Sequence, residues 1–175
     1  ILWEFLACIS LHIMYLRQTL LSAHSKSTCT AIANWIGSNQ KRFDELFHLV
    51  IQRAAWPLSY AVIAYPKLIS KHFGQLLKNL DKSNLHDAVK RNTIRLLQDV
   101  DIPKRYHGTV MNRCFDYIIS PSEKPAVKAF SLTVLQNLSK QYPEIKKELK
   151  TIIEDRWDIE SAAFKARAKR ILKGL

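Results

Sequence analysis

Two pairs of basic residues could bind an anion, because the members of each pair lie one helical turn apart. Arg91 and Arg95 form one pair, and Lys165 and Lys169 form the other. Residues four apart in a helix lie on adjacent turns of one face, so each pair predicts a local concentration of positive charge. Contacts from Lys and Arg dominate sequence-independent binding of phosphates. The alternative is a solvated face on which lysine stems cover apolar edges.

Further cations near these pairs extend them into a candidate basic ridge. Its members are Arg91, Arg95, Lys165, Lys169, Lys90, Lys128, Arg167 and Arg170. The chain carries a net charge of +12, spread over both of its halves. A distributed positive field favours nucleic acid, anionic lipid or an acidic protein as partner, although the charge could also serve solubility alone. Trp56 and Phe164 are candidate aromatic contacts for a base or a partner groove, with core packing as the alternative.

Catalysis has little support in the sequence, and no cofactor is expected. The chain contains no GxGxxG, GxxxxGK[ST], HExxH or GxSxG motif, and its six histidines are scattered singly. Cys114 lies on an apolar stripe, which predicts a small core residue and not a nucleophile. Cys8, Cys29 and Cys114 are too far apart for a CxxC motif, so neither a zinc site nor a disulfide framework is indicated. We expect a reducing, cytoplasmic environment.

A repeat in the chain predicts the elements that position these residues. Four segments align on a pair of small residues, and their anchors are 34, 38 and 36 residues apart. The anchors are Ala54, Ala88, Ala126 and Ala162. Mostly apolar residues follow four, eight and nine places after each anchor, which is the pattern of one helix face. Asn92 and Arg170 interrupt these columns.

The basic pairs have fixed places in this register, three and seven residues after their anchors. In the third segment these places are held by Ala129 and Thr133. An amphipathic stretch precedes each of the four segments, so the repeating unit is a pair of helices. The stretches are 43–52, 73–80, 106–119 and 145–155.

The sequence therefore predicts an all-α fold, a short stack of helix pairs, because one pair cannot bury its apolar face alone. A four-helix bundle is the alternative fold. We expect one domain over residues 14–175. Its parts are a capping pair at about 15–38 and further pairs at about 40–65, 66–99, 104–141 and 143–174.

The first residues are apolar, but we expect no membrane span from them. Glu4 and His12 interrupt residues 1–16, and this run is too short to cross a bilayer. We expect residues 1–13 to be a fragment boundary or an apolar extension, with the domain beginning near Met14. A first amphipathic helix from Leu2 to about Ser22 is the alternative.

Three stretches of the chain resemble a known family. Residues 52–60 (QRAAWPLSY), 85–98 (LHDAVKRNTIRLLQ) and 124–172 are similar to small bacterial HEAT-repeat-like proteins of the armadillo-type α-solenoid class. The resemblance covers most of the chain after about residue 40. It implies a right-handed stack of helix pairs whose second helices line a concave face. The basic ridge would then line a positive groove. No activity is attached to the family.

Three functions follow from these observations, in order of preference. The first is a non-enzymatic interaction module, a monomer, that binds a protein or peptide on the solenoid surface. The second is a nucleic-acid-binding protein that uses the basic ridge. The third is an enzyme, because HEAT-like stacks include DNA glycosylases for alkylated bases. That activity needs an acidic residue facing a basic groove, and Asp87 and Glu160 instead lie before their helices.

Overall fold

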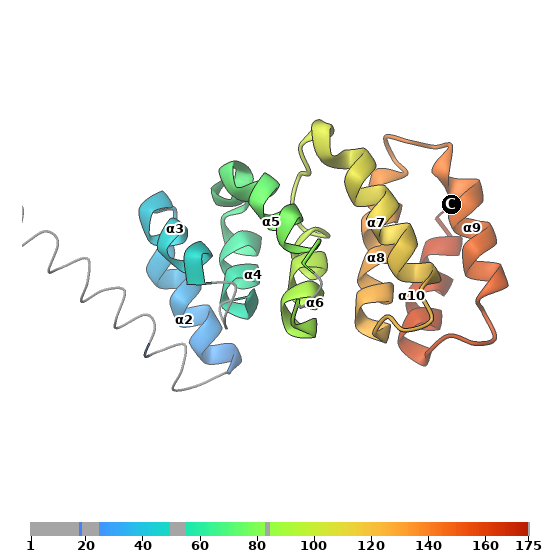
Figure 1. Ribbon diagram of the computed structural model, residues 1–175, viewed down its shortest axis with the longest axis horizontal. Helices are drawn as coiled ribbons and strands as arrows, with labels where there is room; N and C mark the ends of the chain where they lie inside the picture. Colours follow the sequence, from blue (N-terminus) through green and yellow to red (C-terminus); the bar gives the residue numbers. More distant parts are fainter. Residues whose placement is uncertain (1–17, 19–24, 50–54, 83–84, 175) are drawn as a thin grey trace, which may run out of the picture. The chain divides into compact units, whose positions relative to one another are not determined.

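The computed structural model describes residues 18, 25–49, 55–82 and 85–174, and every regular element within these ranges is helical (Figure 1). The α-helices are α2 (Lys26–Ile36), α3 (Gln40–Leu49), α4 (Ala55–Ala64), α5 (Phe73–Asn79), α6 (Asp87–Leu96), α7 (His107–Ile119), α8 (Pro125–Leu138), α9 (Ile145–Asp155) and α10 (Ala162–Leu172). Two short 3-10 helices, η2 (Pro66–His72) and η3 (Lys104–Tyr106), precede α5 and α7.

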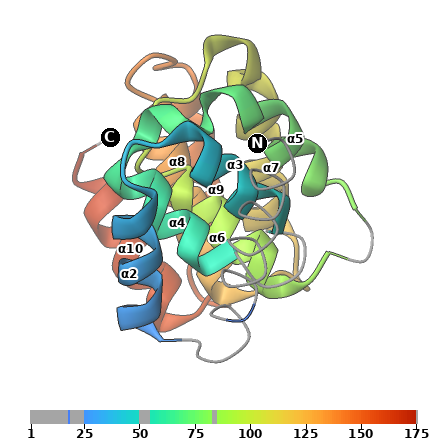
Figure 2. The same ribbon diagram turned by 90° about the vertical axis from the view of Figure 1, so that its left-hand side faces the viewer.

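The chain divides into two compact units, one ending at Asn92 and the other beginning at Thr93. In the N-terminal unit α2 packs along α4, α3 contacts both of them, and η2 joins α4 to α5 (Figure 2). The core of this unit is formed by side chains that are at most 1% exposed. They include Phe43, Leu46, Leu58, Ile69 and Phe73.

In the C-terminal unit α8 is the central helix. It packs against α7 and α10 and also contacts α9 (Figure 1). Its buried face carries Leu132 and Leu135, which meet a core that includes Cys114 and Ile118 of α7 and Phe164 of α10, all 0% exposed. Burial of this aliphatic and aromatic surface is the main force that holds α10 in the unit.

Local sequence signals set several helix ends. Asn39 caps α3, since its Oδ1 accepts the Arg42 N–H at 3.2 Å, and Ser161 caps α10, since its Oγ accepts the Phe164 N–H at 3.3 Å. Gly37 ends α2 with φ of 52°, in the left-handed region where a side chain would be strained.

The all-α prediction is confirmed, and helices occupy the stretches in which amphipathic segments were predicted. Of the four anchors, Ala88, Ala126 and Ala162 lie in the first turns of α6, α8 and α10. Ala54 and the proposed extension at residues 1–13 lie outside the described residues. The extent of the domain, from residue 14 to residue 175, stays a prediction.

Candidate functional site

The structure divides the eight cations of the basic ridge by their exposure. Arg91, Lys169 and Arg170 are exposed; Lys90, Arg95, Lys165 and Arg167 are half-buried; Lys128 is buried. Four of these residues lie on α10, three on α6 and one on α8. Helix α10 is therefore the densest part of the ridge, and it belongs entirely to the C-terminal unit.

Lys128 lies inside the fold, in a cluster of charges that we call the Glu160 cluster (Lys128, Arg156 and Glu160). Glu160 Oε1 accepts hydrogen bonds from Lys128 Nζ at 2.6 Å and from Arg156 Nε at 2.8 Å, and it forms an ion pair with Arg156 Nη2 at 2.7 Å. The Lys128 and Glu160 side chains are only 5% and 6% exposed. Burial raises the pKa of Glu160, but the two cations outweigh it and hold that pKa below its ordinary value.

The expectation that Lys128 adds charge to an exposed ridge is thereby corrected. The physical reason is that a buried ammonium group is stable only beside a carboxylate, and Glu160 supplies one. The same cluster removes Glu160 as a candidate catalytic acid, since its carboxylate is enclosed by two cations.

The repeat register contained a signal for this burial. Lys128 stands two residues after its anchor, at a position that Trp56, Lys90 and Phe164 hold in the other segments. Phe164 is 0% exposed at this position, and Trp56 and Lys90 are half-buried. No member of this column is exposed, and a lysine that is fully buried there requires a partner. The register alone does not name Glu160, because that residue lies in the connection between α9 and α10.

Arg167 is held in place by neutral side chains of two earlier segments. Its Nη1 donates to Thr133 Oγ1 of α8 at 2.9 Å and to Gln98 Oε1 at 3.4 Å. Gln98 is itself fixed, because its Nε2 donates to the Arg95 carbonyl at 2.9 Å and its own carbonyl accepts from Asn137 Nδ2 at 3.0 Å. We call Arg167, Thr133 and Gln98 the Arg167 site.

The charge of the Arg167 site is not balanced by a carboxylate of the described chain. Burial lowers the pKa of the Arg167 guanidinium, and the neighbouring positive charge of Arg170 lowers it further. An arginine nevertheless stays protonated in proteins. The site thus holds a permanent, partly desolvated positive charge next to a second one.

The two aromatic candidates have different positions. Phe164 is fully buried in the C-terminal unit, so it is a core residue and not a contact for a partner. Trp56 is half-buried in α4 and meets Tyr60 edge-on, with ring centroids 6.3 Å apart. A role for Trp56 in binding remains a prediction.

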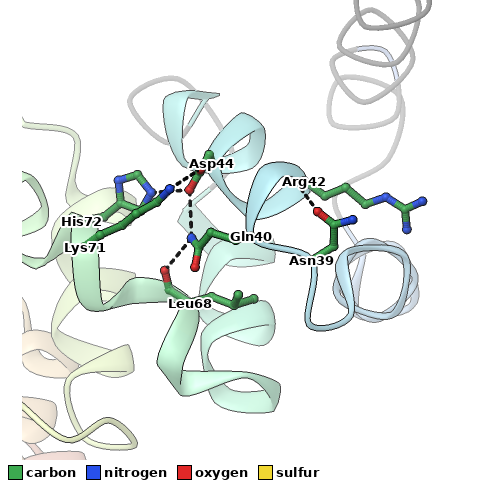
Figure 3. A network of polar contacts seen from close by, with 7 residues as sticks. All are labelled: Asn39, Gln40, Arg42, Asp44, Leu68, Lys71 and His72. Atoms are coloured by element: carbon green, nitrogen blue, oxygen red, sulfur yellow. Dashed lines mark hydrogen bonds and ion pairs between the residues drawn. The ribbon is translucent and has the colours of Figure 1, made fainter.

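A polar network in the N-terminal unit, which the scattered histidines did not suggest, connects α3 to η2. Asp44 accepts hydrogen bonds from Lys71 Nζ at 2.5 Å, from His72 Nε2 at 2.6 Å and from Gln40 Nε2 at 2.9 Å (Figure 3). The ring of His72 stacks on that of Phe47 at a centroid distance of 4.2 Å.

The Asp44–His72 pair resembles part of a catalytic triad, but the geometry favours a structural role. Within the described residues no serine or cysteine contacts the other ring nitrogen of His72, and Asp44 is shared with two further donors. Gln40 also donates to the Leu68 carbonyl at 3.0 Å, so the network ties two segments of backbone together (Figure 3).

We expect the network to make stability depend on acid pH. Burial raises the pKa of Asp44, but hydrogen bonds from Lys71, His72 and Gln40 outweigh it and lower that pKa from 3.8 to about 2. The carboxylate thus contributes stability that is fully present above pH 3.8 and is lost as the pH falls through about 2. Allowing for partial exposure, the contribution is about 1 to 2 kcal/mol.

Urea titrations at a series of acid pH values measure this contribution. Asp44→Asn should be less stable than the parent chain near neutral pH, and the difference should shrink as Asp44 protonates. Glu148→Gln, which alters an exposed acid of α9, is the control and should leave the profile unchanged. A constant difference between Asp44→Asn and the parent at every pH would contradict the assigned role.

Two cysteines of the described chain, Cys29 and Cys114, are buried. Burial raises the pKa of the Cys114 thiol to about 12, which disfavours the thiolate form that a nucleophile needs. No group of His, Cys, Asp or Glu that could hold a metal ion occurs among the described residues. None of the helices described in the structure has the length and apolar character needed to cross a membrane.

Repeated helix pairs of this kind define the class of helical repeat proteins. A family model described as a HEAT repeat domain matches residues 16–175, which is nearly the whole chain. The chain belongs to the HEAT repeat family, whose members commonly serve as protein-interaction scaffolds. Comparisons with curated proteins and with solved structures give no match.

Proposed function

We propose that the chain is a non-enzymatic interaction module that binds a protein or peptide partner on the surface of its helix pairs. The observation that carries the proposal is the distribution of positive charge in the C-terminal unit. Lys128 is the only Lys or Arg of α8, and it is buried against Glu160. Helix α8 therefore presents no exposed cation, although it packs against the basic helix α10.

The exposed cations of the C-terminal unit lie on several elements. Lys104 and Arg105 are exposed on η3, and Lys124 and Lys140 are exposed at the two ends of α8. Lys147 and Lys150 are exposed on α9, and Lys169 and Arg170 are exposed on α10. A nucleic-acid backbone is bound best by a continuous track of cations, because its phosphates are closely and evenly spaced. Cations scattered over several elements instead suit a protein partner with separate acidic side chains.

Exposed aliphatic side chains support the same proposal. Ile119, the last residue of α7, is 50% exposed, and Ile159, in the connection between α9 and α10, is 75% exposed. Large apolar residues that remain in solvent beside charged groups are typical of protein interfaces. Aliphatic side chains make no favourable contact with the charged phosphates of a nucleic-acid backbone.

Nucleic-acid binding is the second candidate, because four cations lie within six residues of α10. They are Lys165, Arg167, Lys169 and Arg170. This alternative predicts affinity for duplex or single-stranded DNA that falls steeply with salt.

Site-specific photo-cross-linking in cells tests the proposal. A photoreactive amino acid is placed at Lys169 on α10, at Ile159, or at the matched exposed position Thr30 on α2. We expect a discrete protein to be cross-linked from Lys169 and from Ile159, but not from Thr30. The purified protein should then form a saturable complex with the purified chain. Labelled DNA should bind weakly and lose affinity at about 0.15 M salt. Tight DNA binding at that salt, without a discrete protein, would overturn the proposal.

A further inference from the structure

The Arg167 site leaves one edge of its guanidinium group open. Both acceptors of Arg167 in the described part of the chain, Thr133 Oγ1 and Gln98 Oε1, take their hydrogen bonds from Nη1. A guanidinium group has five N–H donors in a fixed plane. No acceptor among the described residues takes a hydrogen bond from Nε or Nη2 of Arg167. These two nitrogens form the side-on fork, which is the edge that binds a planar carboxylate through two parallel hydrogen bonds.

The same unit holds an arginine whose Nε–Nη2 edge lies beside an acid. Nε of Arg156 donates to Glu160 Oε1 at 2.8 Å, and Nη2 forms an ion pair with the same oxygen at 2.7 Å. Arg156 and Arg167 are thus both half-buried arginines, and they differ in whether the chain supplies a carboxylate to the fork.

The surroundings of Arg167 add to the attraction for an anion. The guanidinium of Arg170 is exposed and close enough for its charge to act on Arg167, and it forms no ion pair with a described residue. Two like charges held near each other, one of them partly desolvated, are relieved by an incoming negative group. The orientation of the fork is fixed in advance, so little side-chain entropy is lost on binding.

The number and arrangement of donors favour a carboxylate over a nucleic-acid backbone. The two groups that hold Arg167, the hydroxyl of Thr133 and the amide of Gln98, are neutral, and neither could neutralise a second phosphate. One planar fork with one exposed arginine beside it matches one or two acidic side chains.

We propose that the Nε–Nη2 edge of Arg167 is a carboxylate-binding site that anchors an acidic segment of a partner protein. This inference rests on the function proposed above and deepens it, because it names the recognised chemistry and the position of the anchor. Thr133 and Gln98 are positioning residues that hold Nη1, and Arg170 supports the bound segment with a second charge.

The probe is a fluorescently labelled peptide of glutamate and leucine with an acetylated and an amidated end, so that its only charges are side-chain carboxylates. We expect saturable binding in fluorescence anisotropy and none for the matching glutamine peptide. Arg167→Lys keeps the positive charge but removes the fork, and it should weaken binding about tenfold. Lys41→Gln removes an exposed charge from α3 in the N-terminal unit and should change affinity less than about twofold.

The positioning role has its own test. Thr133→Val removes the hydroxyl that holds Nη1 and should weaken binding about threefold, whereas Thr133→Ser keeps a hydroxyl and should restore most of the affinity. Thermal unfolding of each variant confirms that the fold is retained.

The outcomes separate this inference from the proposed function. If Arg167→Lys binds the peptide as the parent does, or if Lys41→Gln weakens binding as much as Arg167→Lys does, the carboxylate site is overturned. Cross-linking of a discrete protein from α10 can still succeed in that case. Two results together would overturn the carboxylate site in favour of a phosphate site. Inorganic phosphate would displace the peptide at equal concentration, and DNA binding would depend on Arg167.

Discussion

Replacing Glu160 with glutamine is expected to lower the free energy of unfolding by about 3 kcal/mol. The substitution keeps the size of the side chain but removes the only negative charge of the Glu160 cluster. Lys128 would then remain 5% exposed without a counter-ion, beside the equally uncompensated Arg156. The loss reflects the unpaired buried charge and not the strength of the ion pair itself, which burial largely offsets.

Urea denaturation of Glu160→Gln and of Glu154→Gln measures the effect against a matched control. Glu154 pairs with Lys150 at 3.8 Å, and both side chains are about 60% exposed, so its replacement should cost no more than about 0.5 kcal/mol. The double variant Glu160→Gln with Lys128→Met should be more stable than Glu160→Gln alone, because it also removes the buried Lys128 ammonium that has lost its counter-ion. A double variant with additive losses would show that the two residues are not coupled.

The effect should also depend on pH. The pKa of Glu160 is held below its ordinary value in the folded chain, so its contribution is present above the ordinary glutamate range and is lost as the pH falls through its lowered value. The difference between the parent chain and Glu160→Gln should therefore shrink in acid.

The helices could be predicted from the sequence because their signals are local. The stretch 145–155 coincides with α9, and 106–119 differs from α7 by a single residue. Both depend on apolar residues that recur within one or two turns. The stretch 43–52 begins three residues after α3 does, because the cap at Asn39, which fixes the start of that helix, was not recognised.

The fate of individual charges could not be predicted in the same way, because it depends on residues far apart in the chain. Lys128 meets Glu160 across 32 positions, and Arg167 meets Gln98 across 69. The repeat pattern grouped Lys128 and Arg167 in one ridge because both lie on second helices of the repeat. Packing instead buries Lys128 against an acid and holds Arg167 beside neutral groups. The spacing of basic residues in the sequence thus predicted the basic helix α10. It did not predict that Arg167 is the residue whose Nε and Nη2 have no acceptor among the described residues.

Phe164 is the residue whose truncation should cost the most in α10. The side chain is 0% exposed, and α10 contacts α8 through a short buried face completed by Ala168 and Ile171. Phe164→Ala should lower the free energy of unfolding by about 3 to 5 kcal/mol, since it removes buried apolar surface and leaves a cavity. Phe164→Leu retains much of the volume and should cost about 1 to 1.5 kcal/mol.

Chemical denaturation of both variants, with Ile159→Ala as the exposed control, decides whether Phe164 belongs to the core or to a binding surface. Ile159→Ala should change stability by less than about 0.5 kcal/mol, because its side chain is already 75% exposed. Unchanged stability in Phe164→Ala would instead return Phe164 to the candidate contacts of a partner.

A large loss of stability in Phe164→Ala has a direct consequence for Arg167, which lies one turn further along the same helix. The Arg167 fork is oriented only while the core holds α10 against α8, so Phe164→Ala should also reduce peptide affinity, even though it removes no charge.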